Sequence, residues 1–250
     1  MKFGILGFGN CGRALASGLF LSGVAKAGDV YICDILPEAR LHAENDYCSP
    51  TTDDVNVVIS NSDILFLVVK GHSFEELADK IDKRKLAGKT VVSFMAGVPF
   101  EKIYSLIGDV TLVRAIPTLA MATCEGVTGY TKAPLAVVMV LNKLGYAVET
   151  TPERIETFTA YSSCGLGYAA YLMDAFISAG EAMGFSREEA EKIAVLTFKN
   201  ACERGDFLNT VKAVATPGGA TEQGVKYMNE NSLYDIVAGA VQKAYERMTR

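Results

Sequence analysis

Three glycines near the start of the chain have the spacing of a phosphate-binding turn. Gly7, Gly9 and Gly12 fit the pattern G-x-G-x-x-G. The pattern follows an apolar stretch, Lys2–Leu6, that predicts a strand, and it opens a stretch, Cys11–Leu21, that predicts a helix. In this context the first glycine permits a tight turn, the second lets a pyrophosphate approach the backbone, and the third lets helix and sheet pack closely. We therefore expect a dinucleotide to bind at Gly7, Phe8, Gly9, Asn10, Cys11 and Gly12.

An acidic residue follows the next predicted strand, Val30–Cys33. Asp34 lies about twenty residues beyond the glycines, where a carboxylate accepts a hydrogen bond from the ribose 2′-OH of NAD and opposes the 2′-phosphate of NADP. The nearest basic residue beyond it is Arg40. The alternative is that Asp34 caps a helix starting at Pro37. We expect the cofactor to be NADH or NADPH, with NADH favoured.

A second glycine-containing loop, Thr216-Pro217-Gly218-Gly219-Ala220-Thr221, precedes a predicted helix. Consecutive backbone N–H groups at a helix N-terminus form a concave site for a carboxylate. The alternative is an ordinary turn at the start of a helix.

These residues need a scaffold, and the first part of the chain predicts an α/β domain. Ile64–Val69 is a continuous apolar run, which is typical of a strand buried on both faces. Val55–Ser60 is β-branched, but Asp54 before it favours a helix. Further strands are expected at Thr90–Phe94, at Leu112–Ile116 and near Ala147, and helices at Phe74–Ile81 and Leu135–Leu144. This alternation predicts a Rossmann-like parallel sheet with helices on both faces over residues 1–150.

Residues 151–250 carry almost no strand signal and predict an all-helical domain. Tyr168–Met183 has helical spacing and only two charged residues, so we expect it to be buried, in part against a second subunit. Ser186–Glu189 fits a capping box, and further helices are expected after Asp206 and from about Leu233. Helices this apolar need another protein surface to bury them, so we expect a homodimer or a larger homo-oligomer.

The composition of the chain limits the partners, the location and the metal sites that we expect. The formal net charge of −5 gives no reason to expect nucleic acid or an anionic membrane as partner. No apolar run is long enough to span a bilayer. The six cysteines form no C-x-x-C pair and no cluster with metal-ligand spacing, so we expect reduced thiols, a cytoplasmic protein and no metal site. Only two histidines are available as proton donors.

Several segments together are similar to one family of reductases. They are Val69-Lys70, Ser93-Phe94-Met95-Ala96-Gly97, Arg114-Ala115-Ile116-Pro117 followed by Glu125-Gly126, and above all Thr216–Thr221, which is similar to the signature Ser-Pro-Gly-Gly-Thr-Thr. Over nearly its whole length the chain resembles the pyrroline-5-carboxylate reductase family. The resemblance implies a Rossmann domain, a helical dimerisation domain, and the NAD(P)H-dependent reduction of Δ1-pyrroline-5-carboxylate to proline in proline biosynthesis. It also implies cofactor contacts at Val69, Lys70, Ala96 and Gly97.

This chemistry needs no strong acid or base from the protein. Hydride attacks the C=N carbon, and an imine nitrogen is basic enough to be protonated beforehand, so orientation supplies much of the rate. We expect the N–H groups of Gly218, Gly219 and Ala220 to hold the substrate carboxylate, with the catalytic Thr221 hydroxyl beside the ring nitrogen. Thr216 and Ser162 add hydroxyl donors. The alternative is that Thr221 only caps the helix.

Some positions depart from the family pattern and keep other functions open. Gly71 and Thr118 replace a proline and an asparagine, and the segment Ser163–Tyr168 keeps only Gly165 and Tyr168 of the family's residues. Another cyclic imine is therefore a possible substrate, and so is a non-catalytic NAD(H)-binding role. A β-hydroxyacid dehydrogenase is disfavoured because Tyr168–Met183 contains no lysine.

Overall fold

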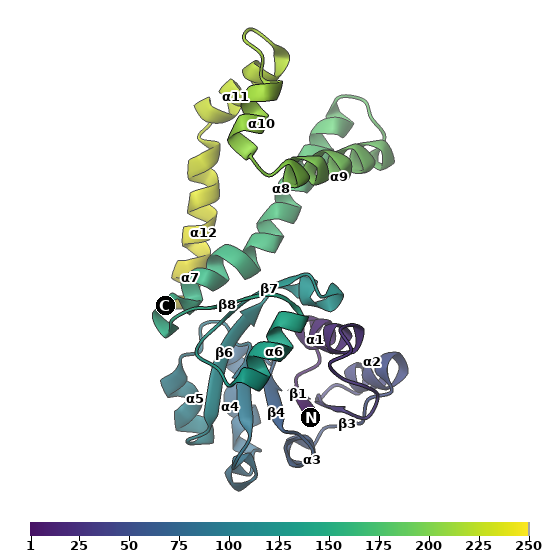
Figure 1. Ribbon diagram of the computed structural model, residues 1–250, viewed down its shortest axis with the longest axis vertical. Helices are drawn as coiled ribbons and strands as arrows, with labels where there is room; N and C mark the ends of the chain where they lie inside the picture. Colours follow the sequence, from purple (N-terminus) through teal and green to yellow (C-terminus); the bar gives the residue numbers. More distant parts are fainter. Residues whose placement is uncertain (250) are drawn as a thin grey trace. The chain divides into compact units, whose positions relative to one another are not determined.

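The computed structural model describes residues 1–249, which form two compact units (Figure 1). The first unit contains Met1–Ser163 and the residues from Tyr245 to Thr249, and the second contains Cys164–Ala244. The last strand ends at Glu149, so the change to helical structure near Thr151 is confirmed. The compact units themselves divide further along the chain, after Ser163.

An eight-stranded sheet forms the centre of the first unit. Its strands are β1 (Phe3–Leu6), β2 (Val30–Cys33), β3 (Thr51–Thr52), β4 (Ile64–Leu67), β5 (Thr90–Ser93), β6 (Thr111–Pro117), β7 (Gly126–Tyr130) and β8 (Gly145–Glu149). Their order in the sheet is β3-β2-β1-β4-β5-β6-β7-β8. The strand order therefore reverses beside β1, and in open α/β sheets ligands bind in the crevice at such a switch point.

The expected parallel sheet is wrong at one place, the pairing of β6 with β7. Pro117 pairs with Thr128 in antiparallel register, whereas every other pair of neighbouring strands is parallel. Only the short 3-10 helix η3 (Leu119–Thr123) joins β6 to β7. A connection this short cannot carry the chain back for a parallel crossover, so the next strand must return in the opposite direction.

Helices cover both faces of the sheet, as expected. They are α1 (Asn10–Leu21), α2 (Pro37–Tyr47), α3 (Val55–Ser60), α4 (Phe74–Asp79), α5 (Phe100–Ile107), α6 (Leu135–Lys143) and α7 (Ile155–Phe158). Shorter turns of helix are η1 (Gly71–Ser73), η2 (Lys83–Leu86), η4 (Pro152–Arg154) and the π-helix η5 (Thr159–Ser163). The side chain of Asp54 accepts a hydrogen bond from the Asn56 N–H, which confirms the helical interpretation of Val55–Ser60.

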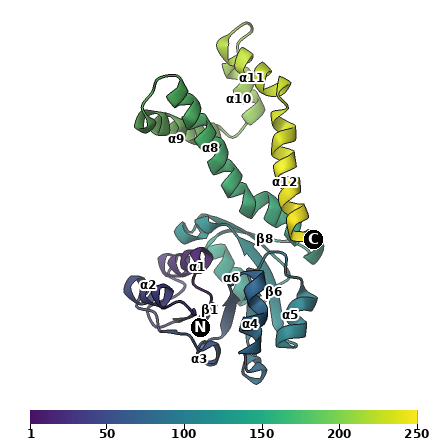
Figure 2. The same cartoon turned by 180° about the vertical axis from the view of Figure 1, so that it is seen from behind.

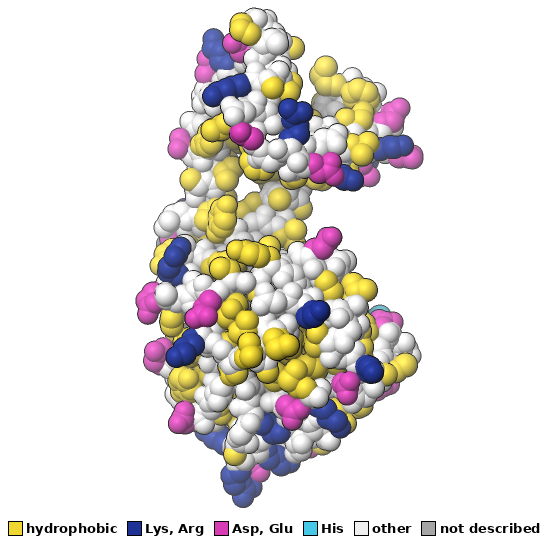
Figure 3. All heavy atoms as spheres, viewed as in Figure 1, with side chains coloured by type: hydrophobic (Ala, Val, Ile, Leu, Met, Phe, Trp, Pro, Cys, Tyr) yellow, Lys and Arg dark blue, Asp and Glu magenta, His cyan; other side chains and the backbone are white. Residues whose placement is uncertain are grey.

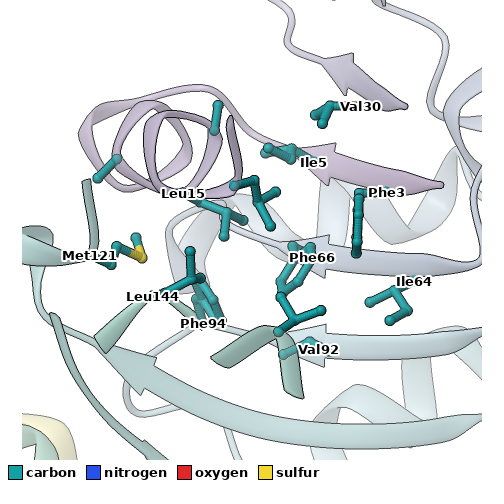
Figure 4. Close-up of a cluster of buried hydrophobic side chains, with 14 of the residues drawn as sticks. Phe3, Ile5, Leu15, Val30, Ile64, Phe66, Val92, Phe94, Met121 and Leu144 are labelled. Atoms are coloured by element: carbon teal, nitrogen blue, oxygen red, sulfur yellow. The ribbon is translucent and has the colours of Figure 1, made fainter. Parts of the chain in front are cut away.

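Strand alternation divides the apolar side chains between two cores. On β4, Ile64 and Phe66 belong to one core with α1, α2 and α6, while Leu65 and Leu67 belong to the other with α3, α4 and α5 (Figures 1 and 2). The ring centroid of Phe66 lies 6.3 Å from that of Phe3 and 5.4 Å from that of Phe94 (Figure 4). The predicted strand is thus buried on both faces, and it pairs with β1 along the whole of that strand, from Phe3 opposite Ile64 to Leu6 opposite Leu67.

The second unit is helical, as expected. Its helices are α8 (Cys164–Ala182), α9 (Arg187–Arg204), α10 (Phe207–Val214), α11 (Ala220–Glu230) and most of α12 (Leu233–Thr249). The capping box of Ser186 and Glu189 is confirmed, and Asp206 caps α10. The sequence predicted that α8 is buried, and a single chain does not bury it, because Ile177 is its only buried residue. A small core of Ile177, Ala190 and Ala194, with Met173 packed against it, joins α8 to α9 and leaves most of the α8 side chains partly or fully exposed.

Candidate functional site

The glycine turn after β1 is built as the spacing predicts. Gly7 has a φ of +103°, which favours glycine, and its N–H donates to the Cys33 carbonyl at 2.8 Å. A Cβ on Gly12 would lie 2.3 Å from the Gly7 carbonyl oxygen. Gly7 therefore makes the turn, and Gly12 lets the helix lie directly against it.

Gly9 faces open space at the start of α1. A Cβ on Gly9 would meet no atom within 4 Å. Gly9 is the N-cap of α1, but no side chain caps that helix and its first turn holds no acidic residue. The first N–H groups of a helix lack intrahelical partners and carry a partial positive charge. This arrangement fits a diphosphate, which would lie against the glycine backbone and accept from these N–H groups.

The Asp34 carboxylate holds the glycine turn in place. Its Oδ2 accepts from the Phe8 N–H at 2.6 Å, and its Oδ1 accepts from the Leu36 N–H at 2.9 Å. Arg40 donates to the backbone carbonyl of Asp34 at 2.8 Å, not to its carboxylate. The alternative that Asp34 caps α2 is wrong, because the N-cap is Leu36 and no side chain caps that helix. Each carboxylate oxygen keeps a free lone pair with which it could accept from a ribose hydroxyl.

A pocket of about 110 Å³ lies at the same edge of the sheet. It is lined by Gly7, Asp34 and Val69, which the sequence placed in the cofactor site. The acidic side chains of Asp53 and Glu76 also line it. The one basic side chain in its lining, that of Lys80, pairs with Glu76 at 2.7 Å. The pocket is therefore acidic, which suits ribose hydroxyls better than a phosphate.

The turn at Ala96–Gly97 follows β5 and lines a second, larger pocket of about 570 Å³. His72, Lys102 and Arg247 also line this pocket. Val69 and the Ala96–Gly97 turn thus lie beyond neighbouring strands of one sheet, at their carboxyl ends. Lys70 lies between Val69 and η1 and lines neither pocket.

Sequence reasoning missed Glu156, which lies beneath the Ala96–Gly97 turn. Its Oε1 lies 2.6 Å from Nη2 of Arg114, and its carboxylate accepts from the Gly97 N–H at 3.2 Å. Arg114 is only 3% exposed. The available signal was an arginine inside the apolar strand β6, because a buried charge requires a partner.

The loop Thr216–Thr221 belongs to the second unit, and its donors are partly occupied. The Gly218 N–H donates to the Glu222 carboxylate at 2.8 Å, and the Gly219 N–H donates to the Thr216 carbonyl at 2.8 Å. Gly219 is the N-cap of α11, and no side chain caps the helix. The alternative that Thr221 caps this helix is therefore wrong. Thr221 is exposed at the second position of α11, where its hydroxyl is open to a ligand.

Ser162 is a residue of the first unit and lies in the π-helix η5. The next residue, Ser163, donates its hydroxyl to the Pro117 carbonyl at 2.9 Å, which fixes η5 to the end of β6. π-Helical turns occur often at functional sites. Ser162 itself is half-buried.

Two sequence families together match most of the chain. The family described as NADP oxidoreductase coenzyme F420-dependent matches residues 2–97, and the family described as pyrroline-5-carboxylate reductase dimerisation matches residues 152–250. A pyrroline-5-carboxylate reductase of Aquifex aeolicus is 27% identical over 260 residues, covering 99% of this chain and 96% of that protein. Over nearly its whole length the chain is similar to pyrroline-5-carboxylate reductases. Another reductase of this name, from Staphylococcus epidermidis, is 26% identical over 95% of this chain and 92% of its own length.

Solved structures of pyrroline-5-carboxylate reductases have the same fold. A Plasmodium falciparum pyrroline carboxylate reductase with NADP bound superposes with a TM-score of 0.90 at 23% identity, over 100% of this chain and 97% of that one. The pyrroline-5-carboxylate reductase of Coxiella burnetii superposes with a TM-score of 0.83 at 23% identity, over 99% of this chain and 97% of that one. The expected fold class, a Rossmann-like domain followed by a helical domain, is confirmed.

Within residues 1–249, none of the helices combines the length and the apolar character that a membrane-spanning segment needs. Nor do three or more His, Cys, Asp or Glu side chains gather there as ligands for a metal ion.

Proposed function

We propose that the protein reduces Δ1-pyrroline-5-carboxylate to L-proline with a reduced nicotinamide dinucleotide. One observation carries the proposal: the open, uncapped glycine turn at Gly9 fits a dinucleotide in a chain that aligns end to end with pyrroline-5-carboxylate reductases. The bound cofactor supplies a hydride to the C=N carbon, and the ring nitrogen carries the added proton.

The chain's own residues bind and orient the cofactor. The N-terminus of α1 and the backbone at Gly9 hold the diphosphate. The pocket beside Asp34 holds the adenosine ribose, and the Ala96–Gly97 turn receives the nicotinamide end. These three places lie at the carboxyl ends of β1, β2 and β5, around the switch point of the sheet.

The substrate carboxylate binds at the N-terminus of α11. The Ala220 N–H is open to it, while the Gly218 N–H becomes available when the substrate displaces the Glu222 carboxylate. A substrate carboxylate would thus replace an internal one, so the exchange costs little electrostatic energy. The Thr221 hydroxyl then lies beside the ring nitrogen, and Thr216 contributes a further hydroxyl donor. The role expected for Ser162, a residue of the first unit, stays a prediction.

The proposed active form is a homodimer made through the helical unit. Large hydrophobic side chains are exposed on every one of its helices (Figure 3). On α8, for example, Tyr171 is 77% exposed. Exposed apolar side chains in this number favour a partner, and a second copy supplies the same surface. The free thiols suit a reducing compartment, so the proposed location is the cytoplasm, and neither nucleic acid nor a membrane is a proposed partner.

The proposed cofactor preference is for NADH. The pocket beside Gly7 carries the carboxylates of Asp34, Asp53 and Glu76, and its lysine is already paired. A phosphate dianion there meets repulsion. We expect kcat/KM to be higher with NADH than with NADPH by about tenfold, roughly the effect of 1.4 kcal/mol. A higher value with NADPH would contradict the preference and indicate that Arg40 turns to the phosphate.

The function is tested by following NADH oxidation at 340 nm with Δ1-pyrroline-5-carboxylate, while proline formation is measured separately. We expect saturable oxidation with one proline formed per NADH consumed. If NADH were oxidised only with a six-membered cyclic imine acid, that imine and not Δ1-pyrroline-5-carboxylate would be the substrate. Tight NADH binding without turnover of either imine would indicate a non-catalytic role.

A further inference from the structure

A buried ion pair holds the backbone on both sides of Ala96. Arg114 donates from Nη2 to the Glu156 carboxylate at 2.6 Å and to the Met95 carbonyl at 3.2 Å. Glu156 accepts from the Gly97 N–H at 3.2 Å. The side chains of the pair are 3% and 15% exposed, so water screens these interactions little. The two peptide groups that flank Ala96 are therefore both tied to the pair.

Peptide planarity sets the direction of the remaining backbone groups. All the peptide bonds here are trans, and the N–H and C=O of one trans peptide point in opposite directions. Because the Met95 C=O points toward Arg114, the Ala96 N–H points away from the pair. Because the Gly97 N–H points toward Glu156, the Ala96 C=O also points away. Ala96 is exposed, and neither of these groups has a hydrogen-bond partner within residues 1–249.

The Ala96–Gly97 turn and the helix that carries Glu156 are both held in position. Gly97 has a φ of +68°, and a Cβ there would lie 3.1 Å from the Met248 carbonyl oxygen. Glu156 lies on α7 next to Ile155, which is fully buried. The ring of Phe158 packs so closely on Gly129 that a Cβ there would lie 2.4 Å from it. A shift of the Glu156 backbone would therefore require α7 to leave the sheet.

A free N–H and a free C=O on one residue match a primary carboxamide, which has one acceptor oxygen and an NH₂ donor. We propose that Glu156 and Arg114 are positioning residues, which preset the Ala96 N–H and C=O to bind the carboxamide of the nicotinamide ring. The inference rests on the proposed function in one respect, the use of a nicotinamide dinucleotide. Neither side chain touches the cofactor, since both act through the backbone of the turn.

The test compares NADH with its reduced 3-acetylpyridine analogue, whose acetyl group lacks the NH₂ donor. Dissociation constants of both are measured by fluorescence titration, and the ratio of the two constants reports the Ala96 contact. We expect the unmodified protein to bind NADH about tenfold more tightly than the analogue, the effect of one hydrogen bond. Glu156→Gln keeps an acceptor for the Gly97 N–H but loses the charge, and we expect the ratio to fall about threefold.

A double variant removes the buried ion pair of Arg114 and Glu156 altogether. Replacing one member of a buried pair leaves an uncompensated charge, whereas replacing both by apolar residues is often tolerated. Arg114→Met with Glu156→Leu is therefore expected to fold and to bind the two dinucleotides with nearly equal affinity. Glu153→Gln makes the same chemical change at an exposed position of η4 and serves as the matched control, with an unchanged ratio.

The outcomes separate a positioning role from a structural one. If the melting temperature of Glu156→Gln falls while its ratio equals that of the unmodified protein, the pair only stabilises the fold and the proposal is overturned. An unmodified protein that fails to discriminate the analogue also overturns it. These titrations contain no imine, so a protein that discriminates as expected but does not reduce pyrroline-5-carboxylate refutes the proposed function and leaves this inference intact.

Discussion

At Gly9 and Gly12, two glycines of one turn are required for different reasons. Gly9 has a φ of −73° and open space where a side chain would begin, so a larger residue fits the free protein. We expect Gly9→Val to lower dinucleotide affinity at least tenfold while costing about 1 kcal/mol or less as an N-cap change. Titration with NADH and thermal unfolding measure the two effects.

Gly12→Ala is the matched comparison. Its Cβ would lie 2.3 Å from the Gly7 carbonyl oxygen, so the backbone of the turn must move. We expect a loss of stability of about 1–3 kcal/mol from this overpacking, together with weaker binding. Unchanged NADH affinity in Gly9→Val would contradict the placement of the diphosphate.

Also at the residue scale, the cysteines differ in burial and therefore in the expected reactivity of their thiols. Burial raises the pKa of the Cys11 thiol from 9.0 to about 12 and, with a contribution from nearby Asp34, that of Cys33 to about 11. Cys48 and Cys202 are exposed. Since the thiolate is the reactive form, we expect iodoacetamide at pH 8 to modify Cys48 and Cys202 much faster than Cys11 and Cys33. Mass spectrometry of the labelled peptides is the measurement, and rapid labelling of Cys11 in the folded protein would contradict it.

The raised pKa values of Cys11 and Cys33 also make the stability of the folded protein depend on pH. In the unfolded chain these thiols ionise near pH 9, whereas in the folded protein they remain protonated to about pH 11 or 12. The unfolded state therefore releases protons first, and the two groups make the folded state less stable as pH rises above 9.

At the scale of elements, α11 begins without a side-chain cap, so its first-turn hydroxyl is free for chemistry. Because Thr221 caps nothing in the free protein, Thr221→Ala should leave the melting temperature nearly unchanged. We expect kcat/KM for the imine to fall tenfold or more, since one lost hydrogen bond in the reacting complex costs roughly 1–3 kcal/mol. A variant with a lower melting temperature and intact kinetics would assign Thr221 to stability instead.

The whole molecule presents more apolar helix surface than one chain covers. We expect a dimer by light scattering at micromolar concentration and a melting temperature that rises with protein concentration. Tyr171→Glu places a charge on the exposed face of α8 and should shift the protein toward monomer. Leu41→Glu makes a similar change at a residue of α2 that is 57% exposed, and it should leave the assembly unchanged. A monomeric unmodified protein would contradict the proposed assembly.

Local signals were enough to predict much of this protein from its sequence. Asp54 before α3 and the capping box before α9 act within one turn of helix, so neighbouring residues decide the outcome. The glycine turn is equally local, because its constraints are a positive φ and a contact between residues five apart. Buried strands such as β4 are visible as apolar runs, since both faces of a parallel sheet are covered.

Only the tertiary structure decided features that depend on residues far apart in the chain. The sequence predicted no strand at Gly126–Tyr130, and only the pairing of β7 with β6 shows that the chain turns back antiparallel there. Arg114 and Glu156 are 42 residues apart and meet because β6 and α7 pack together, as buried charges must find a partner and no local pattern names it. The burial of α8 was also decided by the tertiary structure, because its apolar sequence predicted burial whereas α9 covers only a small part of it.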